Sequence, residues 1–260
     1  MKAVILCGGK GTRISEETRN IPKPMVKIGE YPIILHIINY YYNFGVNEYI
    51  LTLGYLGKVI EEYFIHTYPK FKKLKVKIEK KKNLKIVTYS NNLKLYLLRT
   101  GQNTETGGRL LRSKFLLQDE DFFYVTYGDG LSNVNIEKLT KTYLKNKCVG
   151  ILTCVRPPAR FGKIYISGKH VTKFEEKNQL DEGWINGGYF IFGKKIFNYI
   201  NNDKTNFEKY SLKRIAEKKL LLHNRHYNFW QCMDTLREKI VLNQLYYKKN
   251  VPWIIKKELF

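Results

Sequence analysis

Short apolar runs that end at glycine alternate with longer amphipathic stretches along the first half of the chain. Residues 2–6 form one such β-branched run, and residues 48–53 form a second. Between them, apolar side chains at helical spacing predict a helix that starts at Pro32 and stops at Gly45. A short helix is expected over 58–64. Strand–loop–helix units in series predict a mostly parallel α/β sheet.

This rhythm changes in a basic segment over 70–95, where lysines partly alternate with apolar residues as in a half-exposed strand. We predict a hairpin or β excursion there, with a turn at 90–92 and a return to the sheet at 95–98. No repeat, linker or low-complexity tract follows, so we predict a single domain over 1–260. Further strands are expected over 122–127, 150–155, 184–192 and 220–222, helices over 110–117, 136–144, 212–218 and 235–247, and a hairpin over 163–175 around Gly168.

A glycine cluster directly after the first strand carries the strongest chemical signal. Its sequence is Cys7-Gly8-Gly9-Lys10-Gly11-Thr12-Arg13. Glycines let the backbone come close to a ligand, and successive N–H groups in such a loop form a concave site for anions. Lys23 stands between Pro22 and Pro24, which restrict the backbone that presents it. The loop and its cations predict a polyphosphate site.

Other glycine-loop patterns fit this stretch less well. A Walker-type loop requires Lys and then Ser or Thr after its last glycine, but Gly11 is followed by Thr12 and Arg13. The dinucleotide pattern requires a glycine at position 14, where Ile14 stands. A plain turn leaves the neighbouring cations unexplained.

Two aspartates, Asp129 and Asp234, each follow an apolar strand, where open α/β sheets gather their ligand-binding groups. Two carboxylates at that edge suit Mg²⁺, which takes one or two carboxylates together with phosphate oxygens. For either aspartate alone, a turn or helix-cap role explains the residue equally well. Two glycines inside the strand 184–192 also indicate close approach by a ligand.

Composition adds a large positive charge, with 46 Lys and Arg against 23 Asp and Glu and a net charge of +23. Such a surface attracts phosphate-bearing partners, but the excess is spread along the chain and no nucleic-acid motif accompanies it. We therefore favour compositional bias over nucleic-acid binding. The four cysteines are scattered without a C-x-x-C pair, which predicts reduced, mostly buried thiols.

No apolar run approaches the roughly 20 residues that span a bilayer, and the chain starts without an apolar secretory segment. We therefore expect a cytoplasmic protein without a membrane partner.

The motifs taken together resemble the sugar-1-phosphate nucleotidyltransferases over nearly the full chain. The insertion Ser15-Glu16-Glu17-Thr18 and the ending Trp230-Gln231-Cys232-Met233-Asp234-Thr235 are particular to members that use CTP. The other motifs that carry the resemblance are Gly8-Gly9-Lys10-Gly11-Thr12-Arg13, Pro22-Lys23-Pro24-Met25, Thr106-Gly107-Gly108-Arg109, Tyr127-Gly128-Asp129-Gly130 and Trp184-Ile185-Asn186-Gly187-Gly188.

This resemblance implies a Rossmann-like fold and transfer of a cytidylyl group from CTP to α-D-glucose 1-phosphate, in support of surface-glycan and deoxysugar synthesis. It implies Mg²⁺ on Asp129 and Asp234, with Arg13 and Lys23 acting on the phosphates. The resemblance further assigns substrate binding to Leu6, Cys7, Gly8, Gly9, Lys10, Gly11, Thr12, Arg13, Lys23, Thr104, Gly108, Arg109, Gly128, Glu175, Lys177, Asn186 and Gly187.

The same resemblance implies a homo-oligomer, typically a hexamer, with subunit contacts in the segment 70–95. Cys7 and Lys10 depart from the usual family loop, which has a small residue and an apolar residue there. Another sugar phosphate, another phosphorylated acceptor or another nucleotide remains an alternative. From other classes, a non-catalytic nucleotide-sugar sensor or a nucleic-acid binder is disfavoured because the four residues of the catalytic set occur together.

Overall fold

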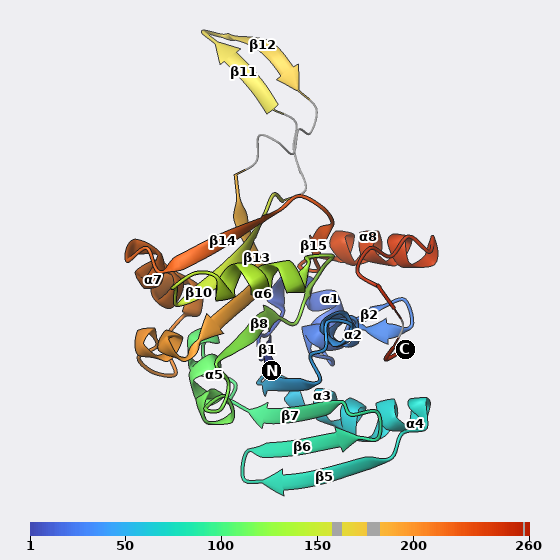
Figure 1. Ribbon diagram of the computed structural model, residues 1–260. Helices are drawn as coiled ribbons and strands as arrows, with labels where there is room; N and C mark the ends of the chain where they lie inside the picture. The colour runs from blue at the N-terminus through green and yellow to red at the C-terminus, as the bar shows by residue number, and fades with distance from the viewer. Residues whose placement is uncertain (158–162, 176–182, 257) are drawn as a thin grey trace.

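The computed structural model describes residues 1–157, 163–175, 183–256 and 258–260. Within them, nine strands form one sheet in the order β14-β10-β13-β8-β1-β4-β7-β6-β5 (Figure 1). These strands are β1 (Lys2–Cys7), β4 (Glu48–Leu53), β5 (Val76–Lys81), β6 (Leu84–Tyr89), β7 (Lys94–Arg99), β8 (Phe122–Tyr127), β10 (Gly150–Val155), β13 (Ile185–Gly193) and β14 (Leu221–His226).

Parallel pairing joins β8, β1, β4 and β7, and it also joins β10 to β14. Strand β13 runs antiparallel to both of its neighbours, and β6 and β5 continue the other end of the sheet in antiparallel fashion. The predicted mixed, largely parallel α/β sheet is confirmed.

Helices and three small two-stranded units complete the described fold. The helices are α1 (Ser15–Thr18), α2 (Ile33–Tyr42), α3 (Gly57–Glu62), α4 (Tyr68–Lys72), α5 (Thr106–Arg112), α6 (Ile136–Leu144), α7 (Lys213–Glu217) and α8 (Leu236–Tyr247). The small units pair β2 (Lys27–Ile28) with β3 (Tyr31–Pro32), β9 (Gly130–Ser132) with β15 (Trp230–Cys232), and β11 (Lys163–Ser167) with β12 (His170–Glu175). The predicted hairpin around Gly168 is confirmed.

Both faces of the sheet are buried at β1, which explains why every residue of this strand after Lys2 is apolar. Ala3, Ile5 and Cys7 belong to one core cluster, whereas Val4 and Leu6 belong to the other. Helices α2 and α6 supply residues to the first cluster, and α5 and α7 supply residues to the second. Each fully buried aliphatic side chain contributes about 1.5–3 kcal/mol, so the strand is fixed before any ligand binds. None of the helices in the described part of the chain is long and apolar enough to cross a bilayer.

The basic segment departs from its prediction in one respect. Its first lysines do not form a strand, because the helical run that starts at α3 continues through a π-helical segment, Tyr63–Thr67, into α4. Pro69 lies near the start of α4, directly after the π-helical segment. The strand β5 begins only at Val76 and is an edge strand with mostly exposed side chains. The turn at 90–92 is confirmed, since the Asn92 N–H donates to the Tyr89 carbonyl at 3.1 Å.

Helix α5 begins at Thr106, four residues before its predicted start at 110. Glycine usually disfavours a helix, but Gly107 and Gly108 pack here against the backbone of Thr205 and Asp203, which leaves no room for a side chain. A contact between distant segments therefore decides where this helix starts.

Candidate active site

Four parallel strands end at one edge of the sheet, and the predicted functional segments follow them. The glycine loop follows β1, Gly54 follows β4, the segment 100–105 follows β7 and Asp129 follows β8. Ligands in open α/β sheets bind beyond the carboxyl ends of the strands. The order of the strands thus places the candidate site.

Two adjoining cavities lie at this edge, with volumes of about 650 Å³ and 820 Å³. The first is lined by the whole glycine loop together with the segment 102–106. The second is lined by Asn186, Gly187, the segment from Trp230 to Cys232, Asp234 and Thr235. The residues that line both cavities are Arg13, Thr106, Tyr127 and Asp129. A ligand made of two parts joined by phosphates suits such a double site.

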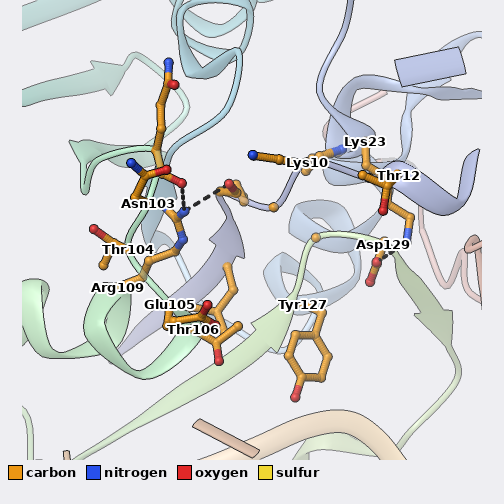
Figure 2. A pocket seen from close by; sticks show the side chains of 18 of the residues that line it. Lys10, Thr12, Lys23, Asn103, Thr104, Glu105, Thr106, Arg109, Tyr127 and Asp129 are labelled. Atoms are coloured by element: carbon orange, nitrogen blue, oxygen red, sulfur yellow. Dashed lines mark hydrogen bonds and ion pairs between the residues drawn. The ribbon is translucent and has the colours of Figure 1, made fainter. Parts of the chain in front are cut away.

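The glycine loop is shaped by its neighbours in the protein. Gly11 has φ +64°, a conformation that favours glycine. The Thr18 hydroxyl donates to the carbonyls of Gly11 at 3.0 Å and Ile14 at 3.1 Å, which fixes the end of the loop. Lys10 and Arg13 are exposed and line the first cavity, where Figure 2 shows Lys10 extending away from the loop. The loop therefore presents backbone N–H groups and two cations to one space.

Lys23 lies at the centre of the site. It begins a 3₁₀ turn, Lys23–Met25, directly after the extended Pro22, and only 11% of its side chain is exposed. Its ammonium contacts Asp129 Oδ2 at 2.5 Å and also contacts Asp234 Oδ1. Burial by itself lowers the pKa of Lys23, but the two carboxylates outweigh burial and the pKa is raised. Lys23 therefore stays charged between two carboxylates.

The two aspartates meet because β9 and β15 pair directly beside them. Gly130 lies opposite Cys232 in this pair, and the Met233 N–H donates to the Asp129 carbonyl at 2.9 Å. Glu238 in the first turn of α8 accepts from the N–H of Asp234 at 2.7 Å. The Arg13 guanidinium adds an ion pair of 2.8 Å to Asp234.

The described residues contain no group of three or more His, Cys, Asp and Glu placed to hold a metal. Within that part of the chain, Asp129 and Asp234 are thus a two-carboxylate set. Both already share the ammonium of Lys23, which shows that one cation can contact both. Hard carboxylate oxygens in this number fit Mg²⁺, whose other ligands are water and phosphate oxygens.

Arg109 and Thr104, which the family resemblance assigns to nucleotide binding, line the first cavity and fasten its wall. The buried Arg109 guanidinium donates to the Gly8 carbonyl at 3.0 Å, the Gly101 carbonyl at 2.8 Å and the Thr100 hydroxyl at 2.7 Å. Figure 2 shows it between the glycine loop and the segment that carries Thr104. Burial lowers the pKa of Arg109, although an arginine remains charged. Its charge contributes to the field of the cavity.

Two predicted glycines have neighbours that exclude a side chain. A β-carbon on Gly128 would approach the Pro24 ring to 2.9 Å, so the turn before Asp129 packs on the segment that carries Lys23. A β-carbon on Gly108 would approach the backbone of Asp203 to 2.4 Å. These glycines are required by the fold whatever ligand binds.

The glycine pair in β13 has a similar explanation. The pairing of β10 with β13 shifts register here, and Gly188 has φ +79° with the Tyr127 ring against it. The atoms that come close to these glycines are therefore protein atoms, not the ligand that the sequence predicted. Gly187 nevertheless also lines the second cavity. Asn186 lies beside them and donates to the Tyr127 hydroxyl at 3.1 Å.

Three other predictions concern Glu175, Lys177 and the thiol of Cys7. Glu175 is the last residue of β12, but its side chain and the whole of Lys177 lie outside the described residues. Cys7 lines the first cavity and is buried, and burial raises the pKa of its thiol well above the usual range. A thiol held neutral in this way is a packing residue and not a nucleophile.

Sequence reasoning missed one acidic residue of the site. Glu208 lies in a π-helical segment, Phe207–Leu212, and lines the second cavity. Its carboxylate accepts from the Tyr127 hydroxyl at 2.6 Å and from the Thr106 hydroxyl at 2.8 Å. No local pattern distinguishes it from other surface glutamates, because its partners lie about 80 and 100 residues away in sequence.

The chain belongs to the nucleotidyl transferase family, whose model matches residues 2–234. It is therefore an enzyme of nucleotidyl transfer. A probable glucose-1-phosphate cytidylyltransferase of Bacillus subtilis (strain 168) is 39% identical over 254 residues, covering 97% of this chain and 99% of that protein. The glucose-1-phosphate cytidylyltransferase of Salmonella typhi is 38% identical over 253 residues, covering 97% of this chain and 98% of that protein.

Solved structures share the fold. A putative glucose-1-phosphate thymidylyltransferase from Bacillus anthracis, solved in complex with sucrose, superposes with a TM-score of 0.68 at 17% identity and covers 94% of each chain. At this identity the likeness concerns the fold, and it agrees with the Rossmann-like arrangement expected from the sequence.

Proposed function

We propose that this enzyme transfers a cytidylyl group from CTP to α-D-glucose 1-phosphate, forming CDP-glucose and pyrophosphate. The single observation that carries the proposal is the Lys23 ammonium between Asp129 and Asp234, at the junction of two cavities beside the glycine loop. The names of the two relatives supply the nucleotide and the sugar phosphate.

The reaction joins two anions, and the chain's charges suit that problem. The sugar phosphate is already a nucleophile and needs no strong base. What opposes reaction is its repulsion from the triphosphate and the charge that develops on the α-phosphate and the leaving pyrophosphate. Arg13, Lys10 and the N–H groups of the glycine loop would bind these phosphates, so catalysis rests on orientation and charge stabilisation.

Asp129 and Asp234 would hold Mg²⁺, and the bound ion would neutralise developing charge on the phosphate oxygens. Lys23 contacts the same two carboxylates. When a divalent cation binds them as well, the Lys23 ammonium would also contact the phosphates. Glu238 would keep Asp234 in place through its bond to the backbone of that residue.

We further propose that the enzyme is a homo-oligomer, typically a hexamer by family resemblance, and that it acts in the cytoplasm, where CTP is available. The exposed edge of the sheet at β5 supports an oligomer, because the unpaired backbone groups of an edge strand can pair with another chain. Light scattering of the pure protein tests this part, and a monomer at working concentration would contradict it.

Pyrophosphate release tests the function. The purified chain is incubated with each of CTP, UTP, dTTP, ATP and GTP, and with several hexose and heptose 1-phosphates, in the presence of Mg²⁺. We expect the highest kcat/KM for CTP with glucose 1-phosphate and a CDP-glucose mass in the product. A higher value for another pair would replace the substrates and keep the reaction class.

A further inference from the structure

A chain of directed hydrogen bonds crosses the junction of the two cavities and ends at Glu208. The Gly188 N–H donates to Asn186 Oδ1 at 2.9 Å, so the amide nitrogen of Asn186 is the atom that faces Tyr127. The Tyr127 hydroxyl accepts from Asn186 and donates to Glu208 Oε1 at 2.6 Å. Every proton on this side thus points toward the carboxylate.

The other oxygen of Glu208 is held in the same way. The Thr106 hydroxyl accepts from the Phe207 N–H at 3.0 Å, which leaves its own proton for Glu208 Oε2 at 2.8 Å. Phe207 is fully buried and packs against Phe190, so the segment that carries Glu208 is anchored in the core. The carboxylate therefore has a fixed position with one donor on each oxygen.

Two donors do not use the full capacity of a carboxylate, which has about four acceptor sites. The described residues include no cation paired with Glu208, and its side chain lines the second cavity together with Asn186, Gly187 and Trp230. A negative charge repels phosphate, so this position suits an uncharged group that donates hydrogen bonds. The hydroxyls of a sugar ring are such groups.

We propose that Glu208 is a specificity-determining residue, whose carboxylate accepts a hydrogen bond from a hydroxyl of the sugar in the second cavity. This proposal rests on the proposed function, because it assumes that the second cavity holds the sugar part of a sugar 1-phosphate. Tyr127 and Thr106 aim the carboxylate. The phosphates would bind to Arg13, which pairs with Asp234, and to Lys23.

The test compares the wild type with Glu208→Gln on glucose 1-phosphate and on analogues in which each ring hydroxyl in turn is replaced by fluorine. Fluorine cannot donate a hydrogen bond. If wild type prefers another sugar phosphate, that sugar and its fluorinated analogues replace glucose. Glu217→Gln is the matched control, since Glu217 is an exposed glutamate of α7 paired only at 3.9 Å with Lys213.

We expect Glu208→Gln to lower kcat/KM by about 10- to 100-fold through the KM of the sugar phosphate, with an unchanged KM for the nucleotide. One fluorinated analogue should lose a similar factor with wild type and clearly less with the variant, because the neutral amide oxygen of Gln accepts more weakly than a carboxylate and both changes act on the same bond. The other analogues should show both losses in full.

Equal losses on every analogue, or a matching rise in the KM of the nucleotide, would show that Glu208 only supports the wall and would overturn the proposal. If Glu208→Gln does not fold by circular dichroism, Glu208→Asp withdraws the charge by one methylene, and the same pattern is expected of it. Failure of the proposed function looks different, since the preferred substrate pair of the wild type itself would change.

Discussion

Lys23→Ala tests whether the ammonium at the centre of the site carries the chemistry. The substitution removes two charge-assisted contacts, to Asp129 and to Asp234, from a side chain that is 11% exposed. Each such contact contributes about 1.5–3 kcal/mol. The Asp129 and Asp234 side chains are 26% and 18% exposed, so water can hydrogen-bond to them and compensate part of the lost contact energy. We therefore expect about 3 kcal/mol less unfolding free energy, at the low end for two contacts.

Turnover should fall further than stability alone requires. Removal of one preorganised charge or donor aimed at a reacting phosphate costs roughly 100- to 1,000-fold in kcat. Pyrophosphate release measured at saturating nucleotide, with folding checked by urea denaturation, separates the two effects. The matched control is Lys27→Ala, an exposed lysine of β2 that should keep both turnover and stability.

The melting temperature of the same variant with and without Mg²⁺ is a second measurement. Because Lys23 and a divalent cation use the same carboxylate oxygens, added Mg²⁺ should raise the melting temperature of Lys23→Ala more than that of wild type. Wild-type kinetics in Lys23→Ala would refute the reasoning and leave Lys23 as a structural lysine. An equal response of both proteins to Mg²⁺ would refute the shared site.

Three further predictions follow from the same geometry. Asp129→Asn or Asp234→Asn should remove most turnover in a folded protein. Excess EDTA should also remove most turnover of the wild type, and added Mg²⁺ should restore it. Full activity of either variant, or of wild type in excess EDTA, would contradict the metal assignment. The raised pKa of Lys23 means that its contribution to stability is complete below its usual pKa of 10.5 and is lost as the pH rises through the raised value. The stability gap between wild type and Lys23→Ala should therefore narrow only above about pH 10.5, and urea titrations that show it closing near neutral pH would contradict this. Replacing exposed lysines of the basic segment with Gln should leave turnover unchanged. Any binding of polyanions by this segment should weaken steeply as the salt concentration rises. A large loss of turnover, with the particle size unchanged by light scattering, would place the segment at the active site. The positions to change are Lys75, Lys77, Lys80 and Lys82.

Much of the first half of the chain could be predicted because its signals are local. The strand β1, the glycine loop and the presentation of Lys23 depend on residues within 25 positions of one another. The strands β4 and β8 and the helix α6 have the bounds expected from their apolar patterns, and α2 lies within its predicted limits of Pro32 and Gly45. Periodicity, glycine and proline act over one or two turns, so they determine such elements.

The remainder depends on contacts between distant segments, which one sequence does not display. The pairing of β9 with β15, which brings Asp129 to Asp234, joins short strands about 100 residues apart. The early start of α5 requires the backbone near Asp203, and the site role of Glu208 requires Tyr127 and Thr106. The position of the two aspartates after apolar strands left a turn or cap role open, and the resemblance to a family decided for a metal role, because the whole pattern of residues carries information that local physics does not.

The two cavities are proposed to accept CTP and glucose 1-phosphate. The most direct measurement is a competition in which CTP, UTP, dTTP, ATP and GTP are present at equal concentrations with glucose 1-phosphate and Mg²⁺. The products are identified and quantified by mass spectrometry. Because all nucleotides compete for one enzyme, the product ratio reports the ratio of their kcat/KM values. We predict that CDP-glucose forms in large excess and that Asp129→Asn loses most of this product. Another nucleoside diphosphate glucose in excess, or no product from the wild type, would contradict the account.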